Sequence, residues 1–357
     1  MGHFTTKKIK LKQVDYIIVG IGIAGITFCE RLVEFGKSFV VFDPGTMNAT
    51  GVAGGVVNPV VLKRFTPAWK ALDFIEAAKP FYRKLNNKIN GHFLHKKPLY
   101  RIFANAEEQN DWMVASDSPV LAPFLSAEII PDVNHNVQAP YGYGEVYNSF
   151  NIDTLAMIQD YREYLSSTHQ LKEEKFDYKK LQTTAGEHKY GDYAASYVIF
   201  SEGTSIIENP NFTFDCIIPK KGEYVVIRSK DLNCEAILKG PYFMIPRNDH
   251  HYQVGATFAH GDFSKKSTEA GKIKLEVAIK KMISCDFEIV DQTCGMRPTV
   301  KDRRPVLGSI EDNGMFFFNG LGTRGLLMAP LLSQLLIDHI ENNAELPSEI
   351  HIKRFES

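Results

Sequence analysis

The chain has 357 residues, of which 44% are hydrophobic and 23% charged, and its formal net charge is −1. A chain of this length is expected to form about two domains and to bury a core without disulfide bonds. The nearly neutral charge excludes a global basic field for nucleic acid, although a local basic patch would still suit an RNA partner.

The cysteines and the N-terminal segment indicate the compartment. The five cysteines include no Cys-x-x-Cys pair and show no zinc-ligand spacing, so we expect no metal site. Their odd number, and the predicted burial of Cys29 in the first helix, indicate reduced thiols and a cytoplasmic protein. Residues 1–14 are polar and basic and lack the apolar core of a signal peptide. The apolar run that follows is too short to cross a bilayer, so no membrane partner is expected.

The first motif predicts a strand, a glycine turn and a helix over residues 15–25, DYIIVGIGIAG. Gly20 permits the tight turn, Gly22 lets the backbone approach a pyrophosphate, and Gly25 allows the helix to pack closely on the strand. The N-terminus of the helix would face the phosphate charge. The alternative is a tight turn in an ordinary α/β protein.

A second apolar run, 38–42, ends at Asp43. This spacing places the carboxylate where it can accept hydrogen bonds from the ribose hydroxyls of a dinucleotide. An acid at this position, with no adjacent arginine, disfavours a 2′-phosphate and therefore NADP.

Further elements follow in chain order. A glycine-rich segment precedes a predicted helix around 70–85, and residues 90–150 are rich in loops. Another helix is predicted over 151–166, capped by Asn151 or Asp153. Strands are predicted over 194–200, 223–228, 242–246 and 252–257, and helices over 267–284 and 329–342. The apolar face of the predicted helix at 70–85 contains Leu72, Ile75, Ala78, Phe81, Tyr82 and Leu85. The apolar face of the predicted helix at 151–166 contains Leu155, Ile158, Tyr161 and Leu165.

Four blocks together resemble the D-amino-acid-oxidase superfamily of FAD enzymes. They are the turn 20–25, the glycines of 51–55, the run GMRPTVKDRRPVLG at 295–308, and residues 320–330. The groups it most resembles are the glycine and sarcosine oxidases and the oxidase domain of the bifunctional enzyme that matures carboxymethylaminomethyl-uridine in tRNA. The GxRPxxxDxxPxxG run is the most specific of the four blocks.

The resemblance implies an α/β, two-domain (α+β) fold in which an antiparallel-sheet substrate domain is inserted into a Rossmann-like FAD-binding domain. We expect the discontinuous FAD-binding domain at 1–88, 150–215 and 290–357, and the substrate domain at 89–149 and 216–289. FAD would be non-covalent, because Pro298 and Thr299 stand after Arg297, where covalent members carry a cysteine nearby. The expected cofactor-binding residues are Gly20, Gly22, Gly25, Asp43, Gly54, Gly55, Val56, Gly203, Gly322, Thr323, Arg324 and Gly325.

Arg297 matches the family arginine that binds the substrate carboxylate. A guanidinium holds a carboxylate through two parallel hydrogen bonds. The alternative is a structural ion pair, with Asp302 for example. Phe243 stands where glycine oxidases carry a carboxylate-binding tyrosine, so Tyr242 and Tyr252 are the candidate replacements and glycine itself is in doubt as the substrate.

The implied function is oxidation of the C–N bond of a small amine or amino acid that carries a carboxylate (glycine-, sarcosine- or D-amino-acid-like), by hydride transfer to flavin N5. Oxygen or another acceptor would take the electrons, and no side chain is assigned as an acid or base. One alternative is removal of a carboxymethyl group from a modified tRNA wobble uridine, for which the lysine pairs at 220–221, 265–266 and 280–281 are candidate contacts. The others are a non-catalytic flavoprotein and a nicotinamide dehydrogenase.

Overall fold

The computed structural model describes residues 11–131, 134–184, 186–259 and 261–356, so most of the predicted basic N-terminal segment lies outside the described residues. The first of its two large sheets contains eight strands. These are β1 (Lys12–Val19), β2 (Phe39–Phe42), β11 (Leu171–Lys172), β12 (Gln182–Thr184), β13 (Glu187–Tyr190), β14 (Tyr193–Phe200), β20 (Val306–Gly308) and β21 (Met315–Asn319).

The centre of this sheet is parallel. Strands β11, β2, β1, β14 and β21 are parallel neighbours, and the β12–β13 hairpin joins β14 antiparallel. The second half of β1 is buried throughout. Tyr16 and Ile18 belong to the core on one face, and Ile17 and Val19 to the core on the other. Parallel sheets are usually covered on both faces, which explains why this strand is apolar without alternation.

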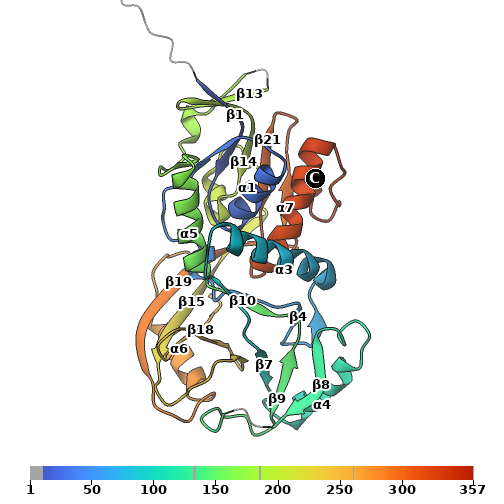
Figure 1. The fold of residues 1–357 in the computed structure, drawn as a ribbon, viewed down its shortest axis with the longest axis vertical. Coiled ribbons are helices and arrows are strands. Elements are labelled where there is room, and N and C mark those ends of the chain that lie inside the picture. Colours follow the sequence, from blue (N-terminus) through green and yellow to red (C-terminus); the bar gives the residue numbers. More distant parts are fainter. Residues whose placement is uncertain (1–10, 132–133, 185, 260, 357) are drawn as a thin grey trace, which may run out of the picture.

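The seven α-helices of the described chain are α1 (Ile23–Glu34), α2 (Ala49–Val52), α3 (Ala71–Lys88), α4 (Ala106–Ser116), α5 (Thr154–Ser167), α6 (Glu269–Ile279) and α7 (Gly325–Asn342). Helices α1 and α3 both pack against α7 beside the first sheet (Figure 1). Asp153 caps α5 by accepting a hydrogen bond from the amide of Ala156, at 3.1 Å. One of the two predicted caps is therefore confirmed.

The second large sheet lies in the lower half of Figure 1 and has the order β19-β15-β18-β17-β16-β7-β9-β8. All neighbours in it are antiparallel except β16 and β7. The strands are β7 (Leu99–Ile102), β8 (Leu125–Ile130), β9 (Tyr143–Val146), β15 (Ile217–Arg228), β16 (Ile237–Lys239), β17 (Phe243–Pro246), β18 (His251–Gly255) and β19 (Glu288–Val300).

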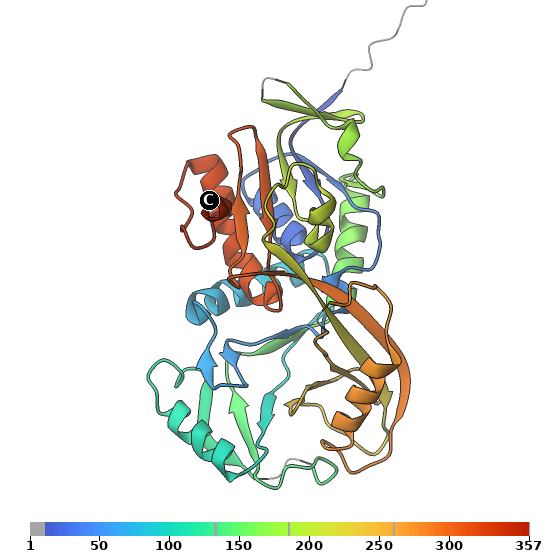
Figure 2. The same ribbon diagram turned by 180° about the vertical axis from the view of Figure 1, so that it is seen from behind.

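Small sheets lie between the large ones. One comprises β3 (Val56–Val57), β10 (Phe150–Ile152) and β6 (Leu94–His95), and the other comprises β4 (Val60–Val61) and β5 (Thr66–Pro67). The long strands β15 and β19 run between the two halves (Figure 2). Strand β19 pairs with β15 along almost its whole length, so it belongs to the second sheet, although the predicted boundary at residue 290 would place it in the first domain.

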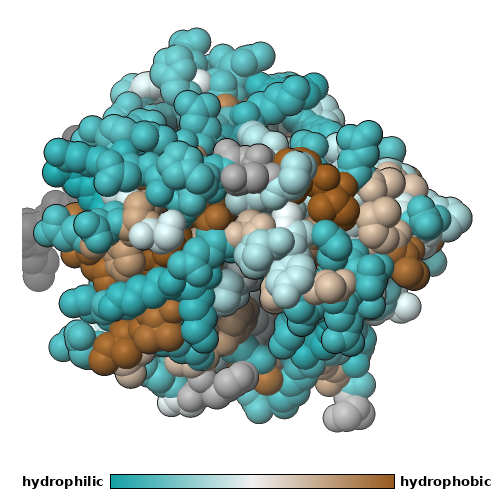
Figure 3. Space-filling model, turned by 90° about the horizontal axis from the view of Figure 1, so that it is seen from below, coloured by the Kyte–Doolittle hydropathy of each residue, from teal (hydrophilic) through white to brown (hydrophobic). Residues whose placement is uncertain are grey.

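The face seen from below is mostly polar, and its hydrophobic side chains form separate groups among hydrophilic ones (Figure 3). Among the described residues, no helix has the length and apolar character needed to cross a bilayer. All five cysteines are free thiols, as predicted.

Candidate active site

A cavity of about 1180 Å³ lies between the two large sheets. It adjoins the carboxyl ends of β1, β2 and β14, where open parallel sheets bind their ligands. Single-ligand pockets usually have about 300–1,000 Å³, so this one has room for a dinucleotide and a small substrate. The predicted residues that line it are Gly20, Gly22, Asp43, Gly54, Gly55, Val56, Gly203, Arg297, Gly322, Thr323, Arg324 and Gly325.

The glycine turn between β1 and α1 suits a pyrophosphate. Gly22 is the N-cap of α1, and the first turn has neither a side-chain cap nor an acidic residue. No acidic residue of the helix itself therefore offsets the positive end of its dipole where it meets the cavity. Gly25 does not line the cavity. A Cβ there would lie 2.1 Å from the carbonyl oxygen of Gly20, so Gly25 packs behind the turn rather than facing a phosphate.

Asp43 holds the glycine turn as well as facing the cavity. Its carboxylate accepts hydrogen bonds from the amides of Ile21, at 2.9 Å, and Gly45, at 2.8 Å. It also pairs with Arg162 of α5, which pairs in turn with Glu173. The expectation that no arginine adjoins Asp43 therefore holds only along the chain, because α5 brings one to it in space.

The backbone at 52–55 is fixed from both sides. Gly55 has φ +73°, and a Cβ there would lie 1.7 Å from the carbonyl oxygen of Ile152. The side-chain Nδ2 of Asn151 donates to the carbonyl oxygen of Gly54 at 2.9 Å, and the Gly54 N–H donates to the Tyr224 hydroxyl at 3.2 Å. A wall tied in this way to β10 of the small three-stranded sheet and to β15 of the second large sheet is pre-organised for a rigid ring system.

Arg324 stands at the N-cap of α7 and reaches across the cavity wall. Its guanidinium donates to the carbonyl oxygens of Asn58, at 2.9 Å, and Val60, at 3.3 Å. Burial lowers the pKa of this guanidinium. Its head group therefore ties two walls together, while the backbone from Gly322 to Gly325 faces the cavity.

Arg297 has a different environment. Its guanidinium lies over Gly222 of the neighbouring strand, where a Cβ would come within 2.1 Å of it. Its neighbours are the Thr257 carbonyl oxygen, at 3.5 Å, and the Phe258 ring, whose centroid is 4.7 Å away. Within the part of the chain that the structure describes, it forms no ion pair with a carboxylate. The alternative partner Asp302 pairs with Arg354 instead.

A row of paired residues forms the floor of the cavity. Paired residues point to the same side of a sheet, and the pairing runs from Tyr224 through Gly255 and Phe243 to Lys239. The Tyr224 ring lies over Gly255, where a Cβ would be 2.3 Å from it. Tyr224 and Lys239 were missed from the sequence because strand alternation does not tell which face is the floor.

Neither Tyr242 nor Tyr252 lines the cavity, so both substrate-binding assignments are corrected. Successive residues of a strand point to opposite faces, and Tyr242 precedes the floor residue Phe243. Tyr242 packs against the core of the second sheet instead. Tyr252 is buried in that core, and its hydroxyl accepts a hydrogen bond from the amide of Cys234 at 3.1 Å.

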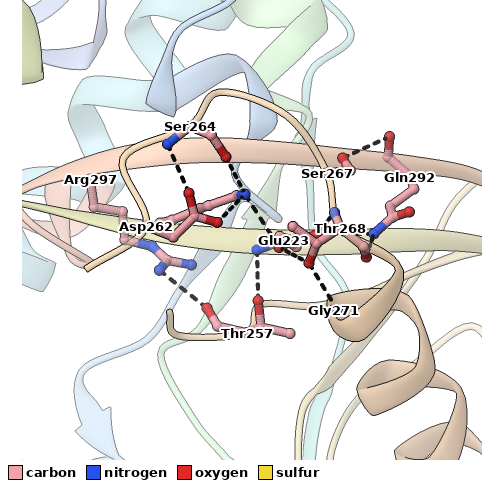
Figure 4. Close-up of polar contacts among 10 residues, drawn as sticks. Glu223, Thr257, Asp262, Ser264, Ser267, Thr268, Gly271, Gln292 and Arg297 are labelled. Carbon is pink, nitrogen blue, oxygen red and sulfur yellow. Dashed lines mark hydrogen bonds and ion pairs between the residues drawn. The ribbon is translucent and has the colours of Figure 1, made fainter. Parts of the chain in front are cut away.

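The residues around Phe258, namely 257–259 and 261–268, form a segment that is held by two buried charges (Figure 4). Lys221 is fully buried and donates to Asp262, at 2.7 Å, and Ser264, at 3.0 Å. Glu223 accepts hydrogen bonds from the amide and the hydroxyl of Thr268, at 2.7 and 2.8 Å. These bonds fix the segment against β15 beside Arg297.

Glu202 follows β14 and lines the cavity. Burial raises the pKa of its carboxyl to about 7, although Tyr178 and Asn209 donate hydrogen bonds to it. Because the folded pKa exceeds the ordinary value of 4.5, the group stabilises the fold below pH 4.5, and that contribution is lost as the pH rises to 7.

Replacing Glu202 with glutamine is therefore expected to remove this pH dependence. The free energy of unfolding of the variant, relative to the native chain, should rise between pH 4.5 and 7 by about 3 kcal/mol at most, since one pKa unit equals about 1.4 kcal/mol. Denaturant titrations of the ligand-free proteins at several pH values measure it. Parallel pH profiles for the two proteins would contradict the shifted pKa.

Comparisons with known proteins agree with this geometry. A glycine oxidase of Bacillus subtilis (strain 168) is 21% identical over 97% of this chain and 98% of its own. The tRNA 5-methylaminomethyl-2-thiouridine biosynthesis bifunctional protein MnmC of Marinobacter nauticus is 22% identical over 91% of this chain, but over 55% of its own. The crystal structure of glycine oxidase from Geobacillus kaustophilus superposes with a TM-score of 0.76, at 18% identity, over 94% of this chain and 96% of that one.

The structural match confirms the mixed α/β fold predicted from the sequence. The family model of the FAD dependent oxidoreductases (DAO) matches residues 15–339. That range includes both sheets and almost the whole cavity wall. The chain therefore belongs to the DAO family of FAD-dependent oxidoreductases, and it is an enzyme that uses FAD.

Proposed function

We propose that the chain oxidises the C–N bond of a small amine that carries a carboxylate, with non-covalently bound FAD. The guanidinium of Arg297 carries this proposal. It lies in the same cavity as the dinucleotide cradle, and among the described residues no carboxylate neutralises it. A half-buried cation without an anionic partner is a site for a ligand carboxylate.

The cofactor residues fit this role. The α1 N-terminus and Gly22 would face the pyrophosphate, Asp43 the ribose, and the fixed backbone at 54–56 the flavin ring. The N-terminus of α7, which has no acidic residue in its first turn, would favour negative charge on the ring. FAD, when bound, supplies the hydride acceptor.

The protein's own contribution is orientation. Arg297 would hold the substrate carboxylate, so the carbon next to the amine is fixed in one place. Tyr224, Phe243 and Phe258 line the cavity beside it, and they exclude water without adding an acid or a base. The substrate amine would enter as the free base, so the chain itself need not supply a proton acceptor.

Action on a modified tRNA uridine is the second candidate, favoured by the similarity to MnmC. The positions of the lysine pairs that were predicted to contact RNA argue against this second function. Lys221 is fully buried and holds Asp262, so the pair 220–221 does not present two charges to RNA. Lys265, Lys266, Lys280 and Lys281 are exposed, but only Lys265 lines the cavity.

An anaerobic absorbance titration tests the proposal. The flavin band of the purified protein should bleach on addition of a small amino acid or N-alkyl glycine, and return when oxygen or an artificial acceptor is admitted. Acid precipitation should release the flavin into the supernatant, since no covalent bond holds it. Bleaching only by carboxymethylaminomethyl-uridine or its RNA would favour tRNA modification, and a flavin that no amine reduces would refute amine oxidation.

A further inference from the structure

The charges that line the cavity are unevenly distributed. The only acidic residues on its described wall are Asp43, Glu202 and Glu208, and all three follow strands of the first sheet or lie close after them. The side formed by the second sheet and the neighbouring loops instead carries four cations and, among the described residues, no carboxylate. These cations are Lys63, Lys239, Lys265 and Arg297. One substrate carboxylate on Arg297 would leave the other charges unmatched.

Lys239 and Arg297 are half-buried, whereas the other two cations, Lys63 and Lys265, are exposed. Lys239 ends β16, and its ammonium group lies 5.1 Å from the centroid of the Phe243 ring. It donates to the carbonyl oxygens of Gly240, at 2.8 Å, and Pro241, at 3.0 Å. An ammonium group has three donors, so one remains for a ligand.

The surroundings of Lys239 do not neutralise it. Arg101 is its partner on β7 and donates to the Lys239 carbonyl oxygen, at 3.1 Å. Glu108 of α4 is the nearby acid, but it is paired with Arg101. Lys63, from the turn between β4 and β5, adds a further positive charge on the same wall. The net charge of these four side chains is therefore positive, as in a site that binds an anion.

Lys239 and Arg297 lie on the same face of the sheet. The Arg297 guanidinium is over Gly222 of β15, and the Lys239 ammonium is beside Phe243 of β17. These strands are two positions apart, so the two head groups are separated by about 10 Å across the strands, and any offset along the strands adds to this distance. If each head group makes a charge-assisted hydrogen bond of about 2.8 Å, at least about 4–5 Å remains between the two bound anionic groups.

We propose that Lys239 forms a second anion subsite and that the preferred substrates are amines with two carboxylates, a few atoms apart, held between Arg297 and Lys239. This inference rests on the proposed amine oxidation and names its substrate class. Iminodiacetate and D-glutamate have suitable spacing. Their one-carboxylate counterparts, N-ethylglycine and D-2-aminobutyrate, leave the second subsite unmatched.

The pKa of Lys239 makes the proposed subsite sensitive to pH. Burial, with smaller contributions from Arg101 and Lys63, lowers the pKa of this ammonium group to about 8, and Glu108 opposes the shift. A bound carboxylate would favour the charged ammonium and raise the pKa. Binding of a second carboxylate should therefore weaken as the pH rises through 8, whereas binding of a single carboxylate to Arg297 should not share this dependence.

The test measures binding separately from turnover. Calorimetry on the FAD-loaded protein compares glutarate, which has two carboxylates and no amine, with butyrate. Glutarate should bind about 10- to 100-fold more tightly at pH 7, which is typical of an added charged hydrogen bond. Lys239→Met should remove most of this preference and its dependence on pH, and Lys239→Arg should restore part of it. Lys266→Met, an exposed lysine outside the cavity wall, is the control.

Steady-state kinetics of turnover form the second part of the test. The ratio of kcat/KM for iminodiacetate to that for N-ethylglycine should fall about tenfold or more in Lys239→Met. Equal binding of glutarate and butyrate, or a ratio unaffected by Lys239→Met, would overturn the subsite even if both amines are oxidised. Tight, Lys239-dependent glutarate binding without reduction of the flavin by any amine would support the subsite and refute amine oxidation. The two proposals can therefore fail separately.

Discussion

Replacing Arg297 with methionine is expected to lower kcat/KM for a carboxylate amine by about 10- to 100-fold, with the change mostly in KM. The variant loses charged hydrogen bonds to the substrate, which contribute about 1.5–3 kcal/mol. Methionine keeps the packing over Gly222, so flavin content and melting temperature should change little. Steady-state kinetics and the flavin absorbance of the same preparations measure both. Arg228→Met, an exposed arginine on neighbouring β15, is the matched control.

Gly222→Ala tests the same site without removing the charge. The new Cβ would come within 2.1 Å of the Arg297 guanidinium, which must move because it is the flexible end of its side chain. KM should therefore rise in a variant that still folds and binds FAD. A normal KM in both Arg297→Met and Gly222→Ala would show that the carboxylate binds elsewhere.

Replacing Asp43 with alanine is expected to weaken FAD binding by about 10-fold or more. The variant loses the charged acceptor for the ribose and leaves the amides of Ile21 and Gly45 without their partner. The glycine turn would lose its support in the same step. Titration of flavin-free protein with FAD, followed by flavin fluorescence, gives the dissociation constant.

Arg162 complicates this experiment, because Asp43→Ala also removes its partner. Glu173→Ala removes the other, exposed partner of Arg162 and leaves Asp43 in place, so it serves as the control. Weaker FAD binding in Asp43→Ala alone would assign the effect to Asp43. Equal FAD affinity in all three proteins would exclude Asp43 from ribose binding.

The sequence predicts the nucleotide-binding half well because its signals are local. A buried strand, a glycine turn and an acid at a set distance form one continuous unit, and β1, α1 and β2 appear where they were expected. The helical periodicity of apolar residues predicted individual buried positions less exactly. Leu72 and Leu155 were predicted on buried helix faces but are 51% and 41% exposed, while Phe74 and Met157 are buried in their helices. Single positions at the edge of an apolar stripe depend on tertiary packing.

The substrate side was harder to predict because strand pairing determines it. Tyr224, Phe243 and Lys239 come from three strands, and they share a face only through the register that joins those strands. A shift of one residue would reverse each side chain. The sequence motif located Arg297, but neither the glycine beneath it nor the lysine three strands beyond Tyr224 belongs to any motif.

The wall of the cavity draws on residues from Val19 to Leu327, and β21 pairs in parallel with β14, which lies more than a hundred residues earlier in the chain. Contacts so distant along the chain form late in folding. On the ribosome, the N-terminal glycine turn would emerge long before the α7 wall exists. A complete cofactor cavity therefore requires synthesis of nearly the whole chain, so FAD is expected to stabilise finished molecules rather than nascent ones.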